Sequence, residues 1–291
     1  MRLRLRLITL FAGLLVSHVS SAAELPQRWV SAGGALSEWV SALGAESKLV
    51  GVDTTSQHPE SLKSLPSIGY QRQLSAEGIL SLKPDVLIGT QEMGPAEVLK
   101  QIQGAGVPVE LFSAQADLAT LQATLLHLGQ LLGDDVNAKG VFDRFKQQMD
   151  RQRVQVKQIQ ATHKVPGVLL LLGHAGGKPM IAGKETAADW LIQQAGGRNL
   201  AIHSGYKPFS VEALAGLNPQ VLVFADRSLS GEAARAALLK ENPVLASIRA
   251  VKAGQVYEMD PTLLVGGLGP RLPERLKQLT AEFYPEAAGT Q

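Results

Sequence analysis

The feature that most constrains the fold of this chain is a sequence passage that occurs twice. Residues 66–89, "PSIGYQRQLSAEGILSLKPDVLIG", place Gly-Tyr ahead of Ser-x-Glu, a proline and an apolar run. Residues 204–226, "SGYKPFSVEALAGLNPQVLVFAD", repeat that order, and residues 74–89 align without a gap on residues 209–224. Any two strand–helix units share apolar periodicity, but this order of residue types exceeds what periodicity requires. The repeat therefore predicts two similar lobes.

The segments around the repeat indicate the fold class. Short apolar runs such as "RWVSAGG", "KLVGVD" and "PDVLIG" alternate with helical segments and with glycine or proline breaks, and the alternation resumes at "GVLLLLGH". This pattern is typical of strand–helix units around a mostly parallel sheet. We therefore expect an α/β protein with two Rossmann-like lobes.

One long helix is predicted between the lobes. Residues 134–163 contain no proline and no glycine after Gly140. Their large apolar side chains fall on one helical stripe, with Gln and Arg on the other faces. The members of the stripe are Phe142, Phe145, Met149, Val156 and Ile159. The expected division is a signal peptide over residues 1–23, an N-terminal lobe over 24–133, a linking helix over 134–163 and a C-terminal lobe over 164–291.

The N-terminus has the layout of a secretory signal peptide. Three arginines in the first six residues precede an apolar stretch over residues 7–16 and small residues over 20–23. The alternative is a buried or amphipathic first helix. Cleavage near Ala22 or Ala23 would lower the Lys and Arg count from 28 to 25, against 26 Asp and Glu, so a net charge of +2 would become about −1. We expect export to a Gram-negative periplasm.

The remaining composition excludes several classes of protein. Without cysteine, the chain has no disulfide, no thiolate metal site and no covalently attached haem. The chain has no basic cluster interleaved with aromatic residues, so nothing in it indicates a nucleic-acid partner. After the signal peptide no apolar run approaches about 18 residues, so we expect a soluble mature protein. "SAGGALSEW" after the first strand is not a G-x-G-x-x-G motif, and no catalytic triad or carboxylate pair is evident, so we expect no enzyme.

The chain resembles the periplasmic substrate-binding proteins of ABC importers that carry haem, cobalamin or siderophores, and most of all the haemin-binding members. The passages that carry this resemblance are "GYQRQLSAEGILSLKPD" and "AGKETAADWLIQQAGG". The resemblance implies two lobes facing across a cleft, ferric haem (protoporphyrin IX) as the transported ligand, and an inner-membrane permease with its ATPase as partners. The alternative is the same fold carrying an iron-siderophore or cobalamin. A bare metal is disfavoured because the histidines are scattered.

Tyr70 is the candidate ligand of the haem iron. A phenol ionises near pH 10, but ferric iron stabilises the phenolate, and the guanidinium of Arg72 would help to hold the negative charge. The residues alone favour a turn tyrosine with its hydroxyl in water; the resemblance reverses that preference. His174, directly after an apolar strand, is the second or alternative ligand, or else a solvated turn histidine.

Five residues have roles that depend on the resemblance. Arg72 and Arg227 would pair with the haem propionates in bidentate fashion, or else are structural surface arginines. Tyr206 takes the place of Tyr70 in the order of the repeat, and either lines the haem pocket or packs within its own lobe. Glu77 and Glu212 recur at matched positions, and in the related proteins one glutamate on each lobe docks on permease arginines. Alternatively, they are acids in the first turn of a helix that a serine caps.

Overall fold

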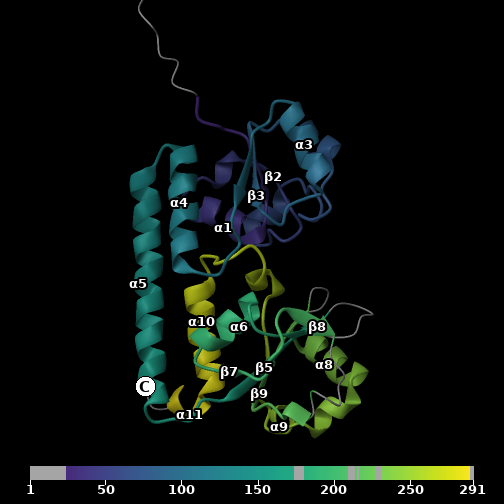
Figure 1. Ribbon diagram of the computed structural model, residues 1–291, viewed down its shortest axis with the longest axis vertical. Helices are drawn as coiled ribbons and strands as arrows, with labels where there is room; N and C mark the ends of the chain where they lie inside the picture. Colours follow the sequence, from purple (N-terminus) through teal and green to yellow (C-terminus); the bar gives the residue numbers. More distant parts are fainter. Residues whose placement is uncertain (1–23, 174–179, 209–213, 215, 227–230, 289–291) are drawn as a thin grey trace, which may run out of the picture.

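The protein, seen here as a computed structural model, folds into two α/β lobes. The structure describes residues 24–173, 180–208, 214, 216–226 and 231–288. The lobes lie one above the other in Figure 1, and helix α5 runs along one side of both. Each lobe has its own sheet, of four strands in the first and six in the second. The predicted α/β class with two lobes and one long helix is confirmed.

The N-terminal lobe is built on a parallel sheet with strand order β2-β1-β3-β4. Its strands are β1 (Trp29–Ala32), β2 (Leu49–Val52), β3 (Val86–Thr90) and β4 (Val109–Phe112). Its helices are α1 (Gly34–Ala42), η1 (Glu46–Lys48), η2 (Glu60–Ser64), α2 (Ala76–Ser81) and α3 (Ala96–Gly104). Every residue of β1 and β3 is buried, because helices cover both faces of the sheet.

Two helices of unequal length follow this sheet. They are α4 (Leu118–Leu132) and α5 (Asp135–Gln160), and Gly133 with a φ of 72° ends the first. Asp134 caps α5 by accepting a hydrogen bond from the N–H of Asn137 at 3.1 Å. Four of the five predicted stripe residues are buried in the core, and Ile159 is partly buried against it. The long helix is thus confirmed, three residues shorter at its end than expected.

The C-terminal lobe contains a mixed sheet with strand order β10-β9-β5-β6-β8, and β7 beside β5. Its strands are β5 (Gly167–Gly173), β6 (Met180–Ala182), β7 (Arg198–Asn199), β8 (Tyr206–Pro208), β9 (Val221–Asp226) and β10 (Val256–Glu258). Its helices are α6 (Ala187–Gln194), α8 (Gly231–Glu241), η3 (Pro243–Ser247), α9 (Arg249–Lys252), η4 (Pro261–Leu264), α10 (Leu272–Phe283) and α11 (Pro285–Ala288). The expectation of parallel pairing holds for its centre, whereas β6 pairs antiparallel with both β5 and β8.

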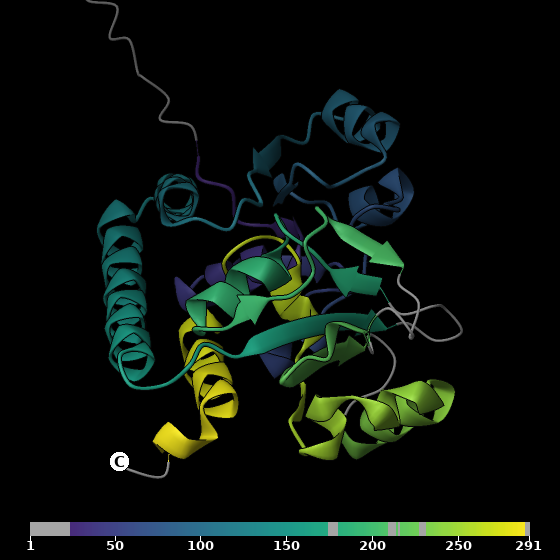
Figure 2. The same ribbon diagram turned by 60° about the horizontal axis from the view of Figure 1, so that its bottom comes forward.

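The run "GVLLLLG" shows why the centre of this sheet is continuously apolar. Val168 and Leu170 face the core that contains α6 and α10, whereas Leu169 and Leu171 face the core beneath α8 and α9. Figure 2 shows α10 and α8 on opposite sides of the sheet. A strand covered on both faces needs apolar side chains at every position rather than at alternate ones.

The sequence repeat corresponds to a repeat in structure. β3 begins at Val86 and β9 at Val221, the positions that the ungapped alignment equates. Each strand pairs in parallel with the first strand of its lobe, β3 with β1 and β9 with β5. The apolar runs that end the two passages, β3 and β9, therefore occupy equivalent places in the two sheets.

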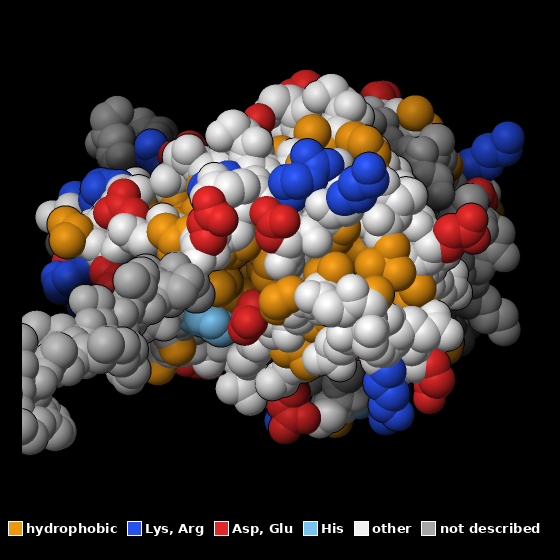
Figure 3. Space-filling view, turned by 90° about the horizontal axis from the view of Figure 1, so that it is seen from above, with side chains coloured by type: hydrophobic (Ala, Val, Ile, Leu, Met, Phe, Trp, Pro, Cys, Tyr) orange, Lys and Arg blue, Asp and Glu red, His pale blue; other side chains and the backbone are white. Residues whose placement is uncertain are grey.

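Two observations on the described residues concern membranes and surface charge. Among the described residues, every helix is too short or too polar to cross a bilayer. On the face shown in Figure 3, acidic and basic side chains are interspersed, with apolar side chains visible between them. That mixture agrees with the absence of a basic cluster in the sequence.

Candidate functional site

Tyr70 lies in a turn that continues from the carboxyl end of β2. The chain returns alongside that strand, since the N–H of Ile68 donates to the Val52 carbonyl and the N–H of Thr54 donates to the Gly69 carbonyl, both at 3.0 Å. Gly69 has a φ of 85°, which its missing side chain permits. Tyr70 itself is half-buried, and within the described residues its hydroxyl makes no hydrogen bond. A phenol at the carboxyl end of a parallel sheet is placed where α/β proteins bind ligands.

A second turn, which follows β3, holds the Tyr70 turn in place. The N–H of Gly94 donates to the carbonyl of Gln71, and the N–H of Leu74 donates to the carbonyl of Gly94, both at 3.0 Å. The side chain of Gln71 is fully buried, and its oxygen faces the backbone at Gly33. The backbone of the residue after Tyr70 is thus held by hydrogen bonds, whereas the two polar atoms of its buried side chain have no hydrogen-bond partner among the described residues. The turn therefore fixes the backbone from which the phenol projects.

Arg72 points to the same second turn. Its Nη2 lies 2.6 Å from Oε2 of Glu92, and both side chains are about half-exposed. The hydrogen bond that Arg72 donates to Glu92 outweighs the opposing effect of burial and raises the pKa of the Arg72 guanidinium, and the charges of Glu92 and Tyr70 add to the rise. The guanidinium predicted to support the phenolate is therefore near Tyr70, but it is shared with a carboxylate that sequence reasoning did not identify.

A buried polar cluster lies at the start of α1, at the neighbouring strand ends. The carboxylate of Asp53 is 2% exposed and accepts hydrogen bonds from the N–H of Gly33 and from the hydroxyl groups of Thr55 and Ser56. Ser37 extends the cluster to Ser56 at 2.8 Å. Each buried polar group here is satisfied by a neighbour, which fixes the β1–α1 turn. The aspartate directly after the apolar run "KLVGV" was the available signal for this cluster.

The C-terminal lobe presents fewer of the predicted residues. Tyr206 lies on β8 opposite Ala182, its ring packs against the core, and its phenol oxygen is buried. Its ring is nonetheless only partly buried, so both alternatives for Tyr206, a pocket wall and packing within its own lobe, stay open. Three other candidates, His174, Arg227 and Glu212, lie outside the described residues.

Glu77 is exposed in the first turn of the short helix α2. Ser75 caps that helix by accepting a hydrogen bond from the N–H of Gly78 at 3.4 Å, as the capping interpretation predicted. The cap leaves the glutamate carboxylate facing solvent. The Glu77 carboxylate is therefore accessible to a protein partner, and its negative charge in the first turn interacts favourably with the helix dipole.

The lobes are joined by a segment that was not foreseen. Residues 259–271, here called the crossing segment, leave the C-terminal lobe after β10, touch the N-terminal lobe and return to α10 (Figure 1). Gly267 has a φ of 90° and packs against Ala114, and the indole N–H of Trp39 donates to the carbonyl of Leu268 at 2.7 Å. The crossing segment is thus docked on the N-terminal lobe by backbone as well as side-chain contacts.

Arg271, at the end of the crossing segment, makes a two-pronged ion pair with Glu38 of α1. Nε and Nη2 of Arg271 lie 2.9 and 2.7 Å from the two carboxylate oxygens of Glu38, which is 5% exposed. Nη1 contacts Asp260 at 2.7 Å, and His58 lies 2.9 Å from the same aspartate oxygen. Burial alone would lower the pKa of Arg271, but the carboxylates of Glu38 and Asp260 outweigh it and raise that pKa.

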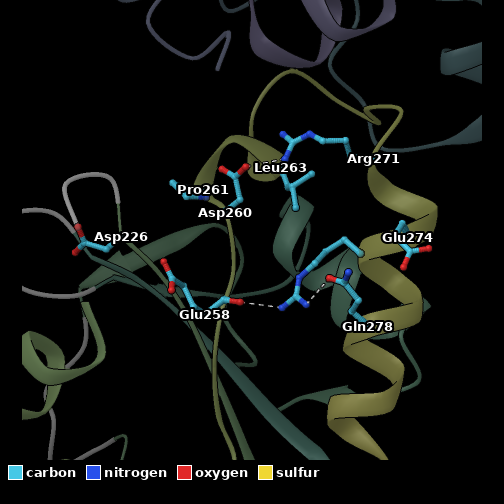
Figure 4. Close-up of a pocket in the computed structure, with 9 residues that line it drawn as sticks. Asp226, Glu258, Asp260, Pro261, Leu263, Arg271, Glu274 and Gln278 are labelled. Carbon is cyan, nitrogen blue, oxygen red and sulfur yellow. Dashed lines mark hydrogen bonds and ion pairs between the residues drawn. The ribbon is translucent and has the colours of Figure 1, made fainter. Parts of the chain in front are cut away.

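A cavity of about 550 Å³ opens beside this network in the C-terminal lobe. Figure 4 shows Asp226 and Glu258, from the ends of β9 and β10, across from Glu274 and Gln278 on α10. The described residues that line it are Asp226, Glu258, Asp260, Pro261, Leu263, Arg271, Glu274, Arg275 and Gln278. Both arginines are already paired with carboxylates. Because the remaining charges of its described lining are acidic, this part of the cavity does not suit an anionic ligand, and no predicted site residue within the described part of the chain lines it.

Comparison with known proteins finds a periplasmic binding protein family that matches residues 30–263. Among solved structures, a periplasmic heme binding protein from Pseudomonas aeruginosa is 60% identical, covers 90% of this chain and 94% of its own, and superimposes with a TM-score of 0.88. The periplasmic heme-binding protein BhuT in complex with two hemes is 36% identical, over 89% of this chain and 98% of its own, with a TM-score of 0.79. A vitamin B12-binding protein of Yersinia pestis is 26% identical over 73% of this chain and 74% of its own.

Proposed function

The chain belongs to the periplasmic binding protein family, and on that basis we propose that it captures haem and delivers it to an inner-membrane ABC transporter. It is a binding protein and not an enzyme. The observation that carries the proposal is its 60% identity to the heme binding protein from Pseudomonas aeruginosa. We propose export by the signal peptide of residues 1–23, and division into lobes over 24–133 and 164–291 with a linking helix over 134–163.

In this proposal Tyr70 binds the ferric iron. A phenolate is a hard anionic oxygen that favours Fe(III), and such a ligand suits a carrier that holds haem without activating oxygen. Two features support Tyr70: it lies on a turn fixed by the second turn after β3, and its hydroxyl is not engaged by any described residue. Arg72 is close enough for the charges of the two side chains to interact.

The other candidates complete the proposed site. His174 would be a second or alternative iron ligand, and Arg72 and Arg227 would contact the propionates. Tyr206 would contribute as a wall of the pocket through its half-buried ring. Glu77 and Glu212 would dock on permease arginines, one from each lobe.

An absorption titration with hemin tests the proposal. The wild-type protein should develop a Soret band with features of a ferric phenolate, and Tyr70→Phe should lose those features while keeping its fold. Tyr257→Phe is the matched control, because its hydroxyl is already bonded to Gln255 at 2.7 Å in the other lobe. Wild-type protein without a Soret shift would refute haem as the ligand; an unchanged spectrum in Tyr70→Phe would refute this tyrosine as the iron ligand.

A corrinoid is the second candidate ligand, favoured by the similarity to a vitamin B12-binding protein. Cyanocobalamin in place of hemin, under the same conditions, distinguishes the two. Preferential binding of cyanocobalamin would support this second function over the first.

Docking is tested by Glu77→Lys in a reconstituted transporter. A reversed charge should depress haem delivery and leave hemin binding unchanged. Glu97→Lys is the matched control, because Glu97 is also an exposed acid in the first turn of a helix of the same lobe. If the two variants deliver haem at equal rates, Glu77 is not a docking residue and acts only as an acid in the first turn of its helix.

A further inference from the structure

We propose that Glu92 is a positioning residue that limits how tightly the Tyr70 site holds haem, by binding and neutralising Arg72. This inference rests on the proposed function. The proposed role of Glu92 is indirect: it acts only through the guanidinium of Arg72 and not by contact with the iron ligand or the haem.

The first support is the exclusive pairing of the two side chains. Nη2 of Arg72 lies 2.6 Å from Oε2 of Glu92, and no other carboxylate of the described residues lies within 4 Å of it. Their side chains are 53% and 43% exposed, so the pair faces solvent on one side and remains open to an incoming ligand. One guanidinium is thus committed to one carboxylate at the edge of the site.

The second support is that the backbone fixes both partners. Glu92 is the second residue after β3, and its N–H donates a hydrogen bond to the hydroxyl oxygen of Thr90 at 3.4 Å. The turn that contains Glu92 is joined to the Tyr70 turn by the reciprocal hydrogen bonds of Gly94 with Gln71 and Leu74. The spacing between the two charged residues is therefore built into the strand ends and is not the chance meeting of two flexible side chains.

The consequence follows from charge. The guanidinium of Arg72 would interact both with an iron-bound phenolate and with the carboxylate of Glu92. Glu92 therefore weakens the electrostatic stabilisation that Arg72 gives to the phenolate. A transport protein must release its ligand, and a counter-ion held beside the ligand residue keeps binding weaker than the site would otherwise allow. Both side chains are half-exposed and screened by water, so the effect is a few-fold change in affinity and not orders of magnitude.

The test measures hemin affinity, and the rate of haem transfer to apomyoglobin, for Glu92→Gln. We expect about two- to five-fold tighter binding and slower transfer by a similar factor, as a surface ion pair of ordinary strength allows. The matched control is Glu97→Gln, an exposed glutamate on the same lobe that should behave as wild type. Tighter binding is a readout that structural damage does not produce. Glu92→Asp keeps the negative charge, so its affinity for hemin should be closer to that of wild type than to that of Glu92→Gln.

A double variant shows whether the effect passes through Arg72. In an Arg72→Ala background, adding Glu92→Gln should change nothing. The inference is overturned if Glu92→Gln binds hemin as the wild type does or more weakly, or if its gain persists without Arg72. If wild-type protein does not bind hemin, the proposed function fails instead, which separates the two ideas.

Discussion

Replacing Arg271 by methionine tests how strongly the crossing segment depends on its ion pair. The substitution removes both hydrogen bonds to Glu38 and leaves a carboxylate that is 5% exposed without a cation. Breaking one partner of a buried ion pair costs about 3–5 kcal/mol, because the other charge stays buried and uncompensated. Arg271 itself is 29% exposed, so water can approach the site and the lower end, about 3 kcal/mol, applies.

The assay is urea denaturation. The midpoint of unfolding should fall, while the m-value, the slope of the free energy of unfolding against urea concentration, stays unchanged. Glu38→Gln/Arg271→Met should recover part of the loss, since the most deeply buried carboxylate is removed while Asp260 keeps only its contact with His58. Lys139→Met is the control: Lys139 pairs with Asp143 on the surface of α5, and the loss there should stay within about 0.5 kcal/mol. A loss below about 1 kcal/mol for Arg271→Met, or a double variant no more stable than the single one, would refute the reasoning.

Two further predictions concern stability. Burial would raise the pKa of Asp260, but Thr262 and Arg271 outweigh it and hold that pKa below its usual value; Asp260 therefore stabilises the fold above about pH 4, and this contribution is lost as the pH falls through the lowered pKa. Asp260→Asn should be less stable than wild type at pH 7, with the difference in urea midpoints closing toward about pH 3; a constant gap would contradict this. Tyr284→Phe should cost about 0.5–1 kcal/mol in thermal unfolding, because its hydroxyl donates to the Gly196 carbonyl at 2.6 Å; an unchanged melting temperature would contradict the role of that bond.

The parts of the fold that sequence predicted are those written in local patterns. The stripe of α5 follows from a period near 3.6 residues, and the continuous run of β5 follows from burial on both faces. Helix α4 and the short strands β6, β7 and β8 were not predicted. Strands of two or three residues are too short for periodicity to register, and their pairing comes from the sheet around them.

The parts that sequence missed depend on contacts between distant residues. Arg271 and Glu38 are 233 positions apart, and "RLPERLKQ" reads only as the start of a helix. Glu92 meets Arg72 because the turn beside the end of β2 is bonded to the turn that follows β3, and the sheet order places these two strands on either side of β1. Tyr206 shows the same limit: the repeat places it opposite Tyr70, but the packing of its ring against the core depends on residues that are distant in the sequence.

The attachment of the lobes at two places restricts their kinematics. Helix α5 passes from one lobe to the other along one side, and the crossing segment is bonded to the N-terminal lobe elsewhere, through Trp39 and Glu38. A body held at one pivot can swing and twist freely, whereas a body held at two pivots rotates only about the line through them. Relative movement of the lobes therefore reduces to a single angle, and one distance between a pair of spin labels, one on each lobe, is enough to follow it.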